Sequence, residues 1–174
     1  MNTDTKIRLR ALEPEDLELL YAIENDVSLW GVGITNVPYS RYTLHDYIAN
    51  ASNDIYVDRQ VRLIVENEEG QTVGIVDVVN FDPQHQRAEL GIVIMNNHRR
   101  QGYASAAVNE LVGYAQRILH LHQIYVFVDI RNEAAKNLFN SLAFSESARL
   151  KDWLFDGKEY RDALLMQRIL QILT

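Results

Sequence analysis

The chain has 174 residues, of which 47% are hydrophobic and 24% charged, an ordinary balance for a globular protein. This length predicts one domain over residues 1–174 with a hydrophobic core of its own. The formal net charge of −7 argues against a broad nucleic-acid-binding face, which needs a surplus of Lys and Arg. The sequence has no Cys, which excludes disulfides and thiol nucleophiles, and no apolar run long enough to span a membrane. We therefore expect a soluble, cytoplasmic protein.

The first quarter of the chain predicts a strand, two helices and a long loop. Alternating apolar and polar residues predict a strand over 7–12. Pro14 with its acidic neighbours predicts a helix start, and the helical spacing continues to Glu24. Residues 26–41 lack a clear period, and a loop of this length inside a compact domain is often functional. A second, short helix is expected over 43–51.

The middle of the chain predicts a meander, the longest helix and a central strand. Strand-like runs around 63–65, at 73–79 and at 88–95 predict an antiparallel meander over 61–95, and Gly91 in the last run indicates a bulge or a close backbone approach. An apolar stripe predicts a helix that begins near Gly102 and continues to Leu119. The apolar run at 124–128 is typical of a central strand.

The end of the chain predicts one more helix and a hairpin. Asn132 is placed to cap a helix that runs to Leu142. Two strand-like runs follow, at 144–150 and 163–166, with Asp-Gly turn chemistry between them. The order of elements predicts a mixed α/β (α+β) domain with a single, mostly antiparallel sheet of about six to seven strands flanked by about four helices.

The most informative stretch is Arg99-Arg100-Gln101-Gly102-Tyr103-Ala104, between a predicted strand and the longest predicted helix. Unpaired amides at a helix start form the positive end of the helix dipole, glycine lets an anion approach them, and the arginines add charge. The loop is neither a Walker loop nor a three-glycine dinucleotide fingerprint. These residues indicate either a pyrophosphate site or a polar turn that caps an amphipathic helix.

The spacing Arg-x-x-Gly-x-Ala before a long helix resembles the acetyl-CoA loop of the GNAT superfamily of N-acetyltransferases. The stretch from Asn132 to Phe144 is similar to the next motif of that family, Asn-x-x-Ala-x-x-Leu-Tyr-x-x-x-Gly-Phe, and residues 9–17 resemble its first strand and helix. The likeness covers nearly the whole chain. Through residues 120–125 it extends to the branch of spermidine acetyltransferases and enzymes that acetylate ribosomal-protein N-termini. It implies an acyltransferase that uses acetyl-CoA as its co-substrate.

The resemblance implies where the cofactor lies. The strand that holds Ile92 to Ile94 would pair with the pantetheine arm and splay apart from the strand at 126–128, where a backbone N–H can polarise the thioester carbonyl. Residues Arg99 to Ala104 would hold the pyrophosphate, and Asn132 would contact the pantetheine end. The implied cofactor-binding residues are Ile92, Val93, Ile94, Arg99, Arg100, Gln101, Gly102, Tyr103, Ala104 and Asn132. No metal is expected.

The chemistry implied is attack of a neutral amine on a thioester, which requires a base. Glu89 is the candidate because the family often has a carboxylate at this place; the alternative is a surface strand residue paired with Arg87 or a neighbour. Phe139 stands where the family usually has a tyrosine acid, and Ala143 replaces its usual glycine. Phe139 cannot donate a proton, although it can pack in the core. The thiolate would therefore leave unaided, or with water or another hydroxyl, or catalysis is weak or lost.

Three residues are candidates for contacts with the acceptor. Trp30 and Tyr39 would line a pocket or pack in the core of their loop, and Asp77 would bind an ammonium or face solvent. One class of function is an enzyme that acetylates a primary amine, either a polyamine such as spermidine or a protein N-terminus. The other is a CoA-binding sensor without catalysis. The net negative charge favours a polycation. A homo-oligomer is compatible with each reading.

Overall fold

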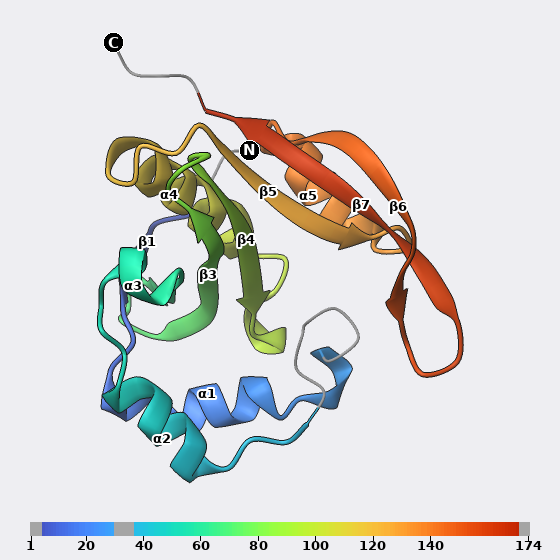
Figure 1. Ribbon diagram of the computed structural model, residues 1–174. Helices are drawn as coiled ribbons and strands as arrows, with labels where there is room; N and C mark the ends of the chain where they lie inside the picture. Colours follow the sequence, from blue (N-terminus) through green and yellow to red (C-terminus); the bar gives the residue numbers. More distant parts are fainter. Residues whose placement is uncertain (1–4, 30–36, 171–174) are drawn as a thin grey trace.

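The computed structural model describes residues 5–29 and 37–170, which form one sheet with helices on both faces (Figure 1). The strands are Ile7–Ala11 (β1), Val61–Asn67 (β2), Thr72–Asp82 (β3), Arg87–Ile94 (β4), Gln123–Asp129 (β5), Ser145–Phe155 (β6) and Tyr160–Ile169 (β7). The α-helices are Leu17–Glu24 (α1), Arg41–Ala49 (α2), Ile55–Asp58 (α3), Tyr103–Arg117 (α4) and Glu133–Ser141 (α5). Short 3-10 turns are Pro14–Asp16 (η1), Val27–Leu29 (η2) and Asn96–His98 (η3).

The seven strands form one mixed sheet in the order β1-β2-β3-β4-β5-β7-β6. Neighbouring strands are antiparallel except for β4 and β5, which run parallel. The expected single, mostly antiparallel sheet with about four longer helices is confirmed. Among the helices of residues 5–29 and 37–170, none is long and apolar enough to cross a membrane.

Different helices cover the two faces of the sheet (Figure 1). Helix α4 packs the apolar stripe predicted from the sequence onto one face, in the larger core cluster. On the other face, Leu20 of α1 and Leu44 of α2 pack against Ile64 of β2 and Ile75 of β3. Side chains alternate between faces along a strand, so Asp77 and the residues paired with it project to the side of α1 and α2. This second face is where the candidate site lies.

Several strands are longer than the sequence predicts. Strand β3 continues to Asp82, through a register shift at Asn80, whose φ is +51°. Strands β6 and β7 extend well beyond 144–150 and 163–166, because the hairpin carries polar residues that give no apolar signal. The turn between these strands lies where Asp-Gly predicts it, with Gly157 at φ +94°. The sequence patterns did not predict the short α3, which Asp54 caps.

Helix α5 ends in a Schellman motif, which explains why Gly-Phe suits this position. The amide of Phe144 donates to the Phe139 carbonyl at 3.0 Å, and the Ala143 amide donates to the Asn140 carbonyl at 3.3 Å. The Phe139 and Phe144 rings meet edge to face at 5.1 Å, the apolar contact that accompanies this motif. Phe139 is only 3% exposed, so it packs in the core. Ala143 has φ +62°, a left-handed conformation that favours glycine.

Ala143→Gly should stabilise the fold by about 0.5–1 kcal/mol. The substitution removes the strain of an alanine in a left-handed conformation. The greater conformational entropy of glycine in the unfolded chain offsets part of this gain. Thermal unfolding should then shift upward by roughly 1–4 °C. Ala134→Gly, in the first turn of the same helix, is the matched control and should lower the stability. Equal destabilisation by both variants would contradict the role given to the conformation at Ala143.

Candidate active site

The central feature of the site is a wedge between β4 and β5. The two parallel strands pair only at Arg87–Gln123, Ala88–Ile124 and Glu89–Tyr125. Beyond that point, residues 90–94 of β4 pair with β3 alone and residues 126–129 of β5 with β7 alone. The facing edges of the two strands are therefore open to an added chain that carries amide groups. The expected splay of the strands at 92–94 and 126–128 is confirmed.

The loop that follows β4 brings a helix start to the open end of the wedge. Gly102 is the N-cap of α4 and has φ +85°. The first helical hydrogen bond comes from the Ala106 amide to the Gly102 carbonyl, so the amides of Tyr103, Ala104 and Ser105 precede the helical ladder. Amides in this position attract anions, because they carry the positive end of the helix dipole.

Side chains of this loop fix its shape. Arg99 Nε donates to the carbonyl of Ile94, the last residue of β4, at 3.0 Å. The side-chain Nε2 of Gln101 donates to the Asn97 carbonyl at 3.2 Å. The main-chain carbonyl of Gln101 accepts a hydrogen bond from Thr5 Oγ1 at 3.2 Å. Arg100 has φ +60° and is exposed. The structure thus brings the predicted loop residues to the same end of β4 as Ile92 to Ile94.

Glu89 lies at the apex of the wedge, in the last pair that joins β4 to β5. Its Oε2 accepts a hydrogen bond from Asn80 Nδ2 at 2.8 Å, and the bulge in β3 places Asn80 there. Burial, and then the neighbouring charge of Glu89, raise the pKa of Tyr125 above its ordinary value. The site therefore pairs one half-buried carboxylate with a phenol that keeps its proton at neutral pH.

Asp77 lies on the same face but is already paired. Its carboxylate accepts hydrogen bonds from Arg62 Nε at 2.8 Å and Nη2 at 3.1 Å, and Arg62 Nη1 donates to Glu24 at 2.6 Å. Burial alone would lower the pKa of Arg62, yet the attraction and hydrogen bonds of Asp77, with the attraction of Glu24, raise it. An ammonium ion at Asp77 would have to compete with this guanidinium. The role of Asp77 in binding an amine stays a prediction.

The remaining candidate residues have structural contacts of their own. Tyr39 exchanges hydrogen bonds with Asn25 through its main chain and packs beside α1 and α2, as the core alternative predicts. Asn132 caps α5 by accepting from the Ala135 amide at 3.0 Å, so its predicted cap is confirmed. Its contact with the cofactor stays a prediction. Trp30 lies outside the described residues.

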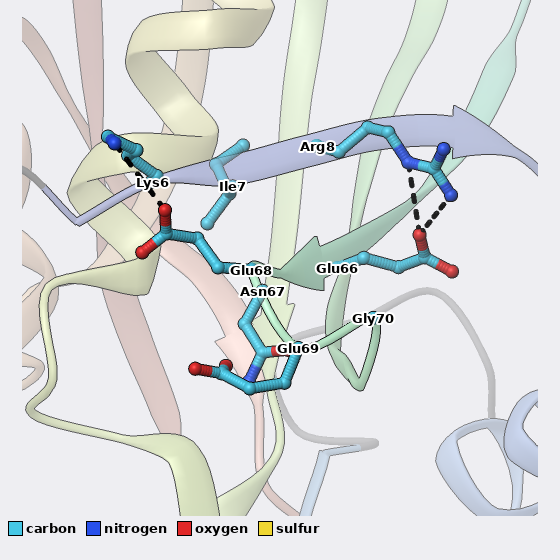
Figure 2. A pocket seen from close by; sticks show the side chains of 8 residues that line it. All are labelled: Lys6, Ile7, Arg8, Glu66, Asn67, Glu68, Glu69 and Gly70. Atoms are coloured by element: carbon cyan, nitrogen blue, oxygen red, sulfur yellow. Dashed lines mark hydrogen bonds and ion pairs between the residues drawn. The ribbon is translucent and has the colours of Figure 1, made fainter.

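A hollow at the far edge of the sheet is not connected to the wedge. It lies between β1 and the turn from β2 to β3, and four of its charged side chains form two pairs (Figure 2). Lys6 lies 3.5 Å from Glu68, and Arg8 donates to Glu66. Because β3 and β4 lie between β1 and β2 and the wedge, this hollow is not part of the candidate site.

Sequence reasoning missed two residues beside the candidate base, Asn80 and Tyr125. The predicted strand ended at residue 79, and an asparagine after a strand normally marks a turn. Tyr125 reads only as one apolar position of a central strand. The register of β3, β4 and β5 is what brings both beside Glu89.

Comparison with known proteins agrees with this geometry. The model of the acetyltransferase (GNAT) domain family matches residues 6–145. The chain is 30% identical over 161 residues to spermidine N(1)-acetyltransferase of Escherichia coli K12, covering 92% of this chain and 84% of that protein. A crystal structure of spermidine N-acetyltransferase from Vibrio cholerae in complex with CoA and spermine is 27% identical, with a TM-score of 0.83 over 94% of this chain and 95% of that one. A dodecameric structure of the Vibrio cholerae enzyme is also 27% identical, with a TM-score of 0.79 over 94% of this chain and 93% of that one.

This chain belongs to the acetyltransferase (GNAT) domain family. The named relatives are, more particularly, bacterial spermidine acetyltransferases. The expected acetyl-CoA-dependent N-acetyltransferase is thereby confirmed at the level of the family. The residues present also fit CoA, because the wedge leaves strand edges open and a glycine at positive φ exposes the amides that begin α4.

Proposed function

We propose that this protein transfers the acetyl group of acetyl-CoA directly to a primary amine of a polyamine such as spermidine. One observation carries the proposal: the wedge closes at Glu89, so a carboxylate lies where the open strand edges meet. The likeness to a spermidine N-acetyltransferase seen with CoA and spermine supports the choice of acceptor. The net charge of −7 also favours the approach of a polycation.

Each part of the site has a role in this proposal. Acetyl-CoA supplies a thioester carbonyl that an amine can attack. The backbone of residues 92–94 and the amides that begin α4 hold the pantetheine arm and the pyrophosphate. Glu89 accepts a proton from the incoming ammonium, directly or through water, while Asn80 holds one of its two oxygens. Phe139 has no proton to donate, so in this proposal the departing CoA thiolate takes its proton from solvent water.

The proposal includes self-association and a place in the cytoplasm. Support for an oligomer comes from the dodecameric structure of the Vibrio cholerae enzyme. Support for the cytoplasm comes from a sequence without cysteine, which suits a reducing compartment.

The purified protein with acetyl-CoA should release CoA thiol in the presence of spermidine or spermine, and much more slowly with a peptide that has a free N-terminus. A thiol-reactive dye follows the release, and a thermal-shift titration with CoA reports binding separately. Turnover with the peptide alone would assign the protein to N-terminal acetylation. Binding of CoA without turnover of any amine would favour a sensor, and no binding of CoA would remove both readings.

A further inference from the structure

Three aromatic side chains form a row on the outer part of the sheet. Tyr125 and Phe127 are two residues apart in β5, so they share a face, and their ring centroids are 5.7 Å apart. Trp153 of β6 stacks on Phe127 at 5.9 Å with an angle of 29° between the rings. None of the three belongs to either core cluster, and Trp153 is 56% exposed.

A bulge in β6 aims Trp153 across the sheet. The pairing of β6 with β7 shifts register between Leu150 and Leu154, and Asp152 within this stretch has φ +51°. Asp162 of β7 holds the bulge, because its carboxylate accepts from the Asp152 amide at 2.9 Å and from Arg149 Nε at 2.6 Å. Strand β7 lies between β5 and β6 (Figure 1). Trp153 therefore reaches over a whole strand to touch Phe127, a re-aimed side chain of the kind that bulges produce beside active sites.

The row begins at the candidate base. Tyr125 pairs with Glu89 across β4 and β5, and paired residues project to the same face. Glu89 thus lies at the apex of the wedge, and the rings of Tyr125, Phe127 and Trp153 continue from it along the same face. A carboxylate followed by aromatic faces matches a chain of methylene groups that carries ammonium ions at intervals, since such rings bind both alkyl groups and cations.

We propose that Tyr125, Phe127 and Trp153 form a binding track for the methylene chain and the distal ammonium of the acceptor amine. The track rests on the proposed acetylation of polyamines and makes it more specific. It selects acceptors with a long chain and a second positive charge, because a short monoamine reaches Glu89 without covering Trp153.

Replacing Trp153 tests the track. Trp153→Ala should raise the KM for spermidine roughly tenfold, as expected for the loss of one exposed aromatic contact with a cation and its alkyl chain. The KM for acetyl-CoA should not change, and neither should the KM for propylamine, a monoamine too short to reach Trp153. Trp153→Phe should restore most of the affinity for spermidine. Phe155→Ala is the matched control, because Phe155 is an exposed aromatic of the same strand that contacts Tyr160 instead.

Two results would overturn the track. One is an unchanged KM for spermidine in Trp153→Ala. This result would overturn the track even if sedimentation showed that the variant no longer associates with other copies of the chain. The other is an equal rise in KM for spermidine and for propylamine. Calorimetric titration of spermidine into the CoA-loaded protein separates this proposal from the proposed function. If the wild-type protein does not acetylate spermidine, the proposed function is wrong. The track still predicts that Trp153→Ala binds spermidine more weakly than the wild type does. Equal binding by the two proteins would overturn the track.

Discussion

Glu89→Gln should lower kcat with spermidine by about 100-fold or more, within the range usual for loss of a general base. The amide has the shape of the carboxylate and can still accept the hydrogen bond from Asn80, so the fold and the wedge should persist. What it cannot do is take a proton from an ammonium ion. Steady-state thiol release measures the loss, and a CoA titration should give the wild-type dissociation constant.

Glu110→Gln is the control for charge, because Glu110 is an exposed residue of α4. It should leave kcat unchanged. A Glu89→Gln protein with wild-type kcat would remove Glu89 as the base, and the remaining explanation would be the surface role that the sequence also allowed. A parallel loss of CoA affinity would mean that the substitution disturbs the wedge rather than the proton transfer.

Gly102→Val should reduce the affinity for CoA by about 100-fold or more. Gly102 has φ +85°, which a β-branched residue adopts only with strain, and an added Cβ would lie 2.6 Å from Thr5 Oγ1. The Thr5 side chain can turn away from the new Cβ, but the strain at positive φ is relieved only when the loop changes conformation. The amides that begin α4 then lose their common direction toward an anion. Calorimetric titration with CoA measures the change.

Gly70→Val is the matched control. Gly70 also has a positive φ, +74°, but it lies in the turn from β2 to β3 with nothing within 4 Å of an added Cβ. Both variants should lose stability through backbone strain, and only Gly102→Val should lose CoA. Normal affinity in Gly102→Val would contradict the placement of the pyrophosphate at this loop.

The sequence predicted the sheet and the loop well because their signals are local. The apolar stripe of α4, the Asn132 cap and the glycine before a long helix all act within a few residues of one another. These patterns also supported the family resemblance, which the family match over residues 6–145 confirms.

The partners of individual side chains could not be predicted, because they depend on register. Asp77 is two residues from Ile75 in the sequence, but only the pairing of β2 with β3 places Arg62 against its carboxylate. From the sequence alone, Phe139 indicates only that the tyrosine that usually acts as the general acid in this family is absent. The Schellman motif and the edge contact with Phe144 show that the same residue also seals the end of α5. The sequence motif identifies the position of Phe139, whereas its packing role becomes visible only in the folded structure.

Mass spectrometry of spermidine after incubation with the protein and acetyl-CoA tests the central claim most directly. We expect a mono-acetylated polyamine to accumulate in step with free CoA thiol, and we expect little of it with the Glu89→Gln protein. Unmodified spermidine in the presence of protein that binds CoA normally would contradict polyamine acetylation at this wedge.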